Sequence, residues 1–243
     1  DAPPTFWYPN AKIGYHRPPR SLFDLGGLTK KEVEMTRATR MAASILGAYA
    51  GLLGVEHGIF EVLQGSTPPD GILINALGAP CEAETVWHAC YPALTVVPNF
   101  LVTGILAILA GLIVLLWATA FVQRRRGGLI LILLSLVMLP VGGGFVPVFV
   151  GVVAGVAATQ INAPFTTWRA HFPVRFSRVL ARLWPWPLVV LLAWVPGSWL
   201  LGSLFNQAML NLSGLLFLLF DLGLPVLTVL SAFAHDTNTP LKK

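Results

Sequence analysis

The chain alternates long apolar runs with short polar or basic blocks, and this alternation predicts its architecture. A run of about 20 apolar residues is long enough to cross the hydrocarbon core of a bilayer as one helix. The pattern therefore predicts an all-α, polytopic integral membrane protein with about six transmembrane helices and an extended N-terminal arm. The predicted spans are residues 41–63, 93–122, 127–140, 145–161, 184–205 and 212–233.

Residues 127–161 pose the main choice of topology. As one helix this run would be about 52 Å long, well over the roughly 30 Å of hydrocarbon, so we expect it to break. The sequence PVGGG at 140–144 supplies the break and predicts a short hairpin of the third and fourth helices. A re-entrant pair that does not reach the far interface is the alternative.

Basic residues set the expected orientation. The loop at 64–92 contains no Lys or Arg, whereas basic blocks flank the other ends of the predicted spans. Short loops rich in Lys and Arg stay in the cytoplasm, so we expect both termini there and loop 64–92 outside the cell membrane. The basic connector at 163–183 has the spacing of an interfacial amphipathic helix, and a plain basic loop is the alternative.

Composition agrees with a membrane-embedded chain. Of the 243 residues, 55% are hydrophobic and 11% are charged, far below the charged share of about a quarter in soluble domains. The lipid bilayer is therefore the expected surrounding of residues 29–243. The net charge of +5 comes from short blocks at span ends rather than from one basic face, so no nucleic-acid partner is predicted.

The first predicted span carries a stripe of small residues. The stripe consists of Gly47, Gly51, Gly54 and Gly58, which share a narrow arc of a helical wheel. Because lipid tails are as apolar as leucine, membrane helices associate through close backbone contact, and the two GxxxG spacings favour it. We expect an opposing helix, either around Gly151 and Gly155 of the same chain or from a neighbouring subunit.

Ionisable residues are sparse at membrane depth, which makes each of them a candidate. Glu56, His57 and Glu61 lie near the outer end of the first span, and Asp221 lies well inside the sixth. A carboxylate in hydrocarbon is costly unless it is paired, protonated or hydrated. Asp221 is either a functional carboxyl or a neutral group hydrogen-bonded between helices. Its expected partners are His57, Tyr49, Thr103, Asn206 or another subunit.

No motif for catalysis or metal binding is evident. The sequence lacks H-E-x-x-H, C-x-x-C, G-x-S-x-G and a phosphate-binding loop, so no enzyme, metal site or cofactor is predicted. A haem would need imidazoles such as those of His57 and His88. These two histidines lie on different elements without a ligand spacing, and the interpretation of them as ordinary interfacial residues is preferred.

Residues 1–28 combine prolines with large aromatic residues, which is typical of an extended arm that lies on a surface. A disordered tail is the alternative. The arm, the glycine stripe and the missing catalytic motif favour a non-catalytic accessory or scaffold subunit of a larger membrane complex. The alternative function is a small carrier or channel, favoured by the intramembrane carboxylates and the broken segment 127–161.

Cys81 and Cys90 lie in the loop that we expect outside the membrane, where an oxidising compartment lets them pair. A disulfide closing so short a loop contributes about 2.5–3 kcal/mol on the chain-entropy model, and two free thiols are the alternative. We predict one disulfide, so intact mass spectrometry should show alkylation of both cysteines only after reduction. Alkylation of both without reductant would contradict the prediction.

Overall fold

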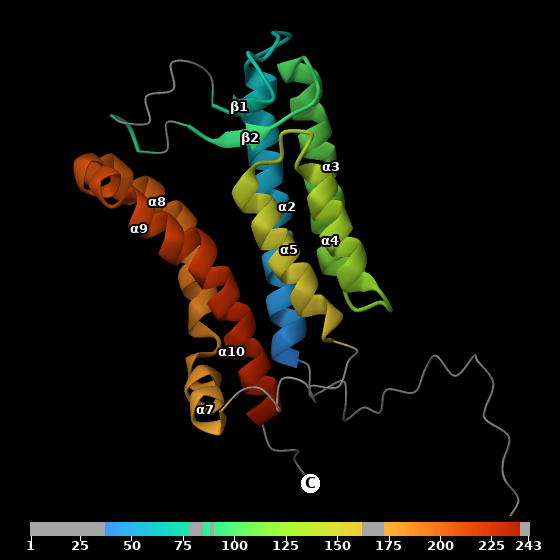
Figure 1. Cartoon of the computed structure of the whole chain (residues 1–243), viewed down its shortest axis with the longest axis vertical. Coiled ribbons are helices and arrows are strands. Elements are labelled where there is room, and N and C mark those ends of the chain that lie inside the picture. The colour runs from blue at the N-terminus through green and yellow to red at the C-terminus, as the bar shows by residue number, and fades with distance from the viewer. Residues whose placement is uncertain (1–36, 78–84, 88–89, 162–172, 239–243) are drawn as a thin grey trace, which may run out of the picture.

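The computed structural model describes residues 37–77, 85–87, 90–161 and 173–238 (Figure 1). The predicted arm at 1–28 and the start of the predicted connector at 163–183 lie outside the described residues. The described part is mostly helical. Its elements in chain order are α2 (Arg37–Leu63), β1 (Leu73–Asn75), β2 (Pro92–Leu94), α3 (Phe100–Ala120), α4 (Gly127–Met138), α5 (Phe145–Thr159), α7 (Val174–Leu183), α8 (Trp186–Asn211), α9 (Ser213–Leu216), the π-helix η1 (Phe217–Gly223) and α10 (Leu224–Asn238).

Apolar helices of membrane-crossing length dominate this fold. Within the described ranges, four helical segments are long and apolar enough to cross a bilayer: α2, α3, α8 and the continuous run from α9 to α10. They confirm an integral membrane protein in contact with lipid. Helices α4 and α5 are apolar but only 12 and 15 residues long. At 1.5 Å per residue they measure about 18 and 22 Å, so the number of six spans stays a prediction.

Helix α3 begins at Phe100, and the predicted start at residue 93 is wrong. Pro98 lacks a backbone N–H, and the side chain of Asn99 caps the helix by accepting a hydrogen bond from the Val102 N–H at 3.1 Å. The residues before them form β2, which pairs antiparallel with β1. Apart from this two-stranded sheet, the described part of the chain has only helices as regular structure.

The break between α4 and α5 falls at residues 139–144, within the predicted PVGGG sequence. Gly142 and Gly144 have positive φ angles of 92° and 79°, which a residue without a Cβ adopts at little cost. The loop after β2 pairs with this turn, since Val96 N–H donates to Pro140 O and Gly142 N–H donates to Leu94 O. The loop and the turn therefore supply hydrogen-bond partners for part of each other's backbone.

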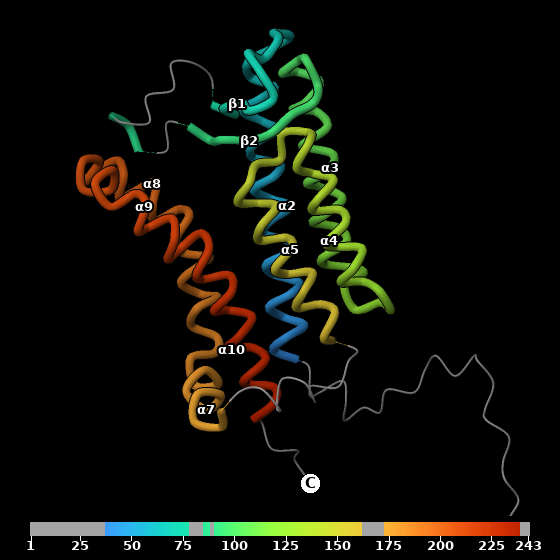
Figure 2. The backbone as a smooth tube through the Cα atoms, in the orientation of Figure 1, coloured from blue at the N-terminus to red at the C-terminus, as the bar shows by residue number. Residues whose placement is uncertain are grey.

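Helix α2 is the central element of the bundle formed by α2, α3, α4 and α5, as the tube trace shows (Figure 2). A Cβ atom on Gly51 would lie 2.6 Å from Gly111 O, and one on Gly58 would lie 2.6 Å from Gly104 O. The opposing helix of the stripe is thus α3 of the same chain. Gly155 of α5, expected there from sequence, faces α4 instead.

Helix α10 joins the C-terminal helices to this bundle through a buried carboxylate. Asp236 is 5% exposed and accepts hydrogen bonds from Ala38 N–H at 3.1 Å, Thr39 N–H at 2.8 Å and the Thr39 hydroxyl at 2.7 Å. The first turn of a helix leaves its N–H groups without intrahelical partners, so Asp236 caps α2 from the other end of the chain. The helix that contains it also extends beyond the predicted end at 233.

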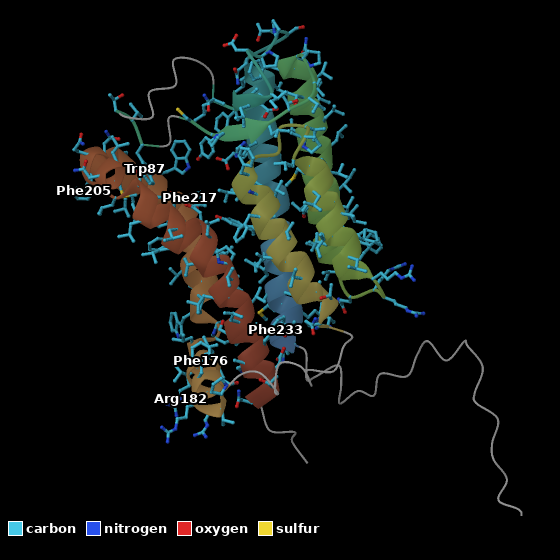
Figure 3. All side chains as sticks on the ribbon, viewed as in Figure 1. Trp87, Phe176, Arg182, Phe205, Phe217 and Phe233 are labelled. Carbon is cyan, nitrogen blue, oxygen red and sulfur yellow. The ribbon has the colours of Figure 1, made fainter. Side chains whose placement is uncertain are left out.

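Arg182 lies at one end of the molecule, which we call the basic end, and the described residues 64–77 and 90–99 lie at the opposite, loop end (Figure 3). At the basic end, Arg40 donates a hydrogen bond to Gln123 at 3.1 Å, which connects the start of α2 to the end of α3. Helix α7, which carries Arg182, packs beside α10, and Asn238 donates to the Ser177 hydroxyl at 2.6 Å. The orientation of these two ends across the membrane stays a prediction.

Six crossings and a cytoplasmic basic end predict a specific pattern of cysteine accessibility. In a background without Cys81 and Cys90, Asp70→Cys should react with an impermeant maleimide from outside, whereas Arg125→Cys and Asn238→Cys should react only after permeabilisation. External labelling at Asn238 with internal labelling at Arg125 would show that α4 and α5 do not make two crossings.

The backbone contact between α2 and α3 predicts an asymmetric response to one added methyl group. Gly51→Ala should destabilise the protein by about 1–3 kcal/mol, because the new Cβ meets backbone atoms of α3 that cannot move alone. Gly197→Ala in α8 is the matched control, since nothing lies within 4 Å of its Cβ position. Thermal unfolding in mild detergent measures both variants, and equal melting temperatures would contradict the prediction.

Candidate functional site

A cavity of about 390 Å³ lies between the bundle and the C-terminal helices. Toward the loop end, α8 and α9 lie away from α2 (Figure 1). The lining residues place the cavity beside this region, next to the loop that precedes β2. Its lining residues come from four parts of the fold: Tyr49, Leu53, Glu56 and His57 of α2; Cys90, Tyr91 and Pro92 of the loop; Phe145, Val146 and Pro147 of α5; and Trp194, Val195, Ser198, Trp199, Phe217 and Asp221 of α8 and η1.

Helix α2 contributes three polar side chains to the wall, those of Tyr49, Glu56 and His57. Tyr49, Leu53 and Glu56 follow each other at spacings of four and three, so they share one face of the helix. This face is distinct from the face at Gly51 and Gly58 that packs on α3. One helix thus presents a small-residue surface to its partner and a polar surface to the cavity.

Asp221 enters the cavity from an irregular part of the opposite wall. It lies within η1, where the helix widens to a π-helix, a feature that occurs frequently at functional sites. The Trp194 side chain lies close enough to interact with the Asp221 carboxyl, and its ring stacks on Phe220 with centroids 3.9 Å apart. Phe217, one helical turn before Asp221, lines the same wall (Figure 3).

Tyr91 covers the cavity at the loop end. Its ring meets His57 edge-on at 5.2 Å between centroids and stacks at 6.1 Å on Trp199, so it bridges α2 and α8. Burial raises the pKa of the Tyr91 phenol, and the charges of Glu56 and Asp221 raise it further. Tyr91 therefore stays a neutral hydroxyl group.

The loop that precedes β2 is attached to α8 by paired hydrogen bonds. Trp87 N–H donates to the Asn206 side-chain oxygen at 2.8 Å, and the Asn206 amide donates to Thr85 O at 2.6 Å. The Trp87 ring lies against Gly202, where a Cβ atom would leave no room for it. Figure 3 shows Trp87 beside the loop end of α8. The loop consequently spans the space between α2 and α8 above the cavity.

His57 and Glu61 lie one turn apart beneath the turn that joins α4 to α5. Their exposed fractions are 4% and 0%, and the turn glycines Gly144 and Gly142 approach them so closely that neither position has room for a Cβ atom. Among the described residues, His57 Nδ1 and both Glu61 carboxyl oxygens have no hydrogen-bond partner. His57 still reaches the cavity wall, whereas Glu61 is buried outside it.

The structure brings together three of the four predicted intramembrane candidates, Glu56, His57 and Asp221, in one cavity. Two expected partners of Asp221 are engaged elsewhere. The Thr103 hydroxyl lies 2.6 Å from that of Thr95, and Asn206 binds the loop. Tyr49 and His57, the other two expected partners within the chain, share the cavity with Asp221.

The aromatic lining was not predicted from sequence. Trp199 alone carries no signal of a cavity wall, because tryptophan in membrane proteins usually acts as an interfacial anchor. The available signal was the spacing of three or four between Val195, Ser198 and Trp199, which together with Trp194 form one side of α8 at the cavity. This spacing indicates a cavity wall only once the facing residues of α2 and the loop are known.

Two sequence hypotheses depend on residues outside the described ranges, Cys81 and His88. The Cys81–Cys90 disulfide and the disfavoured haem ligation by His57 and His88 therefore stay predictions. Within the described residues, no three His, Cys, Asp or Glu side chains are grouped as a metal site.

The cavity is the candidate functional site of this chain. Two carboxyl groups, an imidazole and several aromatic side chains line it, and they come from α2, the loop, α5, α8 and η1. No protein-family model, curated protein or solved structure matches the chain.

Proposed function

We propose that the protein is a small membrane carrier that binds a solute in the cavity between the bundle and the C-terminal helices. The observation that supports this proposal is the position of Glu56 of α2 and Asp221 of η1, which line one cavity. A carboxyl group at membrane depth is costly, and membrane proteins use such groups in ion, proton and substrate pathways. The cavity volume of about 390 Å³ falls in the range of small-molecule sites.

Irregular helices on one side of the cavity support transport rather than static binding. Asp221 lies in the π-helix η1, Pro196 interrupts α8, and Phe205 further along α8 has non-helical angles of φ −133° and ψ 44°. Carriers commonly place their substrate sites at discontinuous helices between two repeating or packed units. The C-terminal helices thus have the local deformability that a moving wall requires.

Attachment points at both ends define how such a wall would move. At the basic end, Asp236 binds the first turn of α2, and at the loop end Asn206 binds the loop at Thr85 and Trp87. Rocking of the C-terminal helices about the Asp236 contact would open the loop end, while closure there would bring α8 back toward α2. In the carrier proposal the two contacts alternate in strength, with six spans and both termini in the cytoplasm.

The accessory-subunit function stays a second prediction, and fewer observations now support it. The glycine stripe no longer requires a neighbouring subunit, because α3 of the same chain packs against it. The arm at 1–28, the other feature that favours a partner protein, lies outside the described residues. The cavity, in contrast, is a positive reason for the carrier.

The carrier proposal predicts that transport depends on the cavity and not on the neighbouring lipid-facing surface. In proteoliposomes tested with a panel of amines, amino acids, carboxylates and sugars, Leu53→Trp should abolish uptake of the transported solute by filling the cavity. Leu52→Trp is the matched control, because Leu52 is 55% exposed on the adjacent helix face. Asp221→Asn should reduce uptake about tenfold or more without loss of folding.

Two outcomes would contradict this function. Uptake that survives Leu53→Trp and Asp221→Asn would place transport outside the cavity. The absence of uptake for every solute, together with a wild-type phenotype for both variants in cells, would favour the accessory subunit. Melting temperatures in detergent show whether each variant is folded.

A further inference from the structure

We propose that the cavity selects an organic cation, namely a compact ammonium group on an apolar body. This ligand class rests on the function proposed above and makes it more specific. The evidence comes from the charges, the aromatic walls and the size of the cavity, which agree with one another.

The charge of the lining is one-sided. Glu56 and Asp221 supply two carboxyl groups from opposite walls, and the lining residues include no Lys or Arg. In a low-dielectric site an anionic ligand would be repelled by these groups, while a cationic ligand would provide the countercharge that they lack. Charge complementarity therefore favours a cation over an anion or a zwitterion that carries its own carboxylate.

The aromatic residues around these carboxyls are suited to a diffuse positive charge. Aromatic residues of α2, the loop, α5, α8 and η1 line the cavity, and the negative π-face of an aromatic ring attracts an ammonium group within about 6 Å of its centre. The aromatic lining consists of Tyr49, Tyr91, Phe145, Trp194, Trp199 and Phe217. A strongly hydrated metal ion would gain little from such walls, whereas a substituted ammonium would bury its apolar groups on them.

A buried group independent of the carboxyls also indicates a ligand. His57 lines the cavity, is 4% exposed, and has no partner for Nδ1 among the described residues. Buried polar atoms are nearly always hydrogen-bonded in folded proteins, so a ligand in the cavity would meet a buried imidazole that still has hydrogen-bonding capacity.

The size of the cavity excludes bulky lipids as the preferred guest. A volume of about 390 Å³ lies near the lower end of the range for small-molecule sites. Tyr91 closes the loop end by contacting both His57 and Trp199. A compact amine with one aromatic or branched apolar group fits this space, whereas a two-chain lipid does not.

The test compares three probes of similar shape that differ in charge, using the purified full chain in lipid nanodiscs. Benzyltrimethylammonium is the cation, neopentylbenzene its uncharged carbon isostere, and benzenesulfonate an anionic aromatic probe. Calorimetric titration, with empty nanodiscs subtracted, should show the cation binding about tenfold or more tightly than the isostere and no saturable binding of the anion. Leu53→Trp should abolish binding of the cation, and Leu52→Trp should leave it unchanged.

Charge-neutral variants complete the test. Asp221→Asn and Glu56→Gln should each weaken binding of the cation about tenfold or more while leaving binding of the isostere within about twofold. If the isostere or the anion binds as tightly as the cation and Leu53→Trp removes that binding, the cavity is a ligand site and the cation class is wrong. If none of the probes binds, the cation class is wrong, and uptake of the solute panel decides separately whether the carrier function stands.

Discussion

The backbone contact between α2 and α3 is the constraint on which the rest of the structure depends. It is reciprocal, because a Cβ on Gly111 would lie 2.6 Å from Gly51 O, and one on Gly104 would lie 2.6 Å from Gly58 O. In lipid this close approach replaces the hydrophobic effect as the source of helix association. With its glycine face packed on α3, helix α2 presents Glu56 to the cavity beside the C-terminal helices. The packing constraint therefore also creates the polar wall of the cavity.

Local sequence patterns were sufficient for the features that depend on local physics. Long apolar runs identified membrane helices, PVGGG located the break between α4 and α5, and the glycine spacing identified the packing face of α2. Rare carboxyls at membrane depth identified Glu56 and Asp221. Each of these inferences requires only a local signal: the spacing of similar residues, a turn-forming sequence, or the cost of burying a carboxyl group in hydrocarbon.

The remaining features arise from contacts between residues far apart in the chain. Gly104 and Gly111 are seven residues apart, so a search for GxxxG spacings does not find the face that opposes the stripe. The carboxylate of Asp236 pairs with Thr39, 197 positions away, and no periodicity connects the two. Likewise, Trp194 and Tyr91 become parts of one site only when α8 and the loop meet α2.

The short α4–α5 hairpin also has a consequence for the membrane itself. Helices of about 18 and 22 Å are shorter than the roughly 30 Å of hydrocarbon, and the loop around Val96 reaches down to pair with the turn at Pro140. In the six-span topology, lipid chains beside this hairpin would relieve the mismatch by thinning the bilayer locally. A protein with that topology would prefer thin bilayers over thick ones.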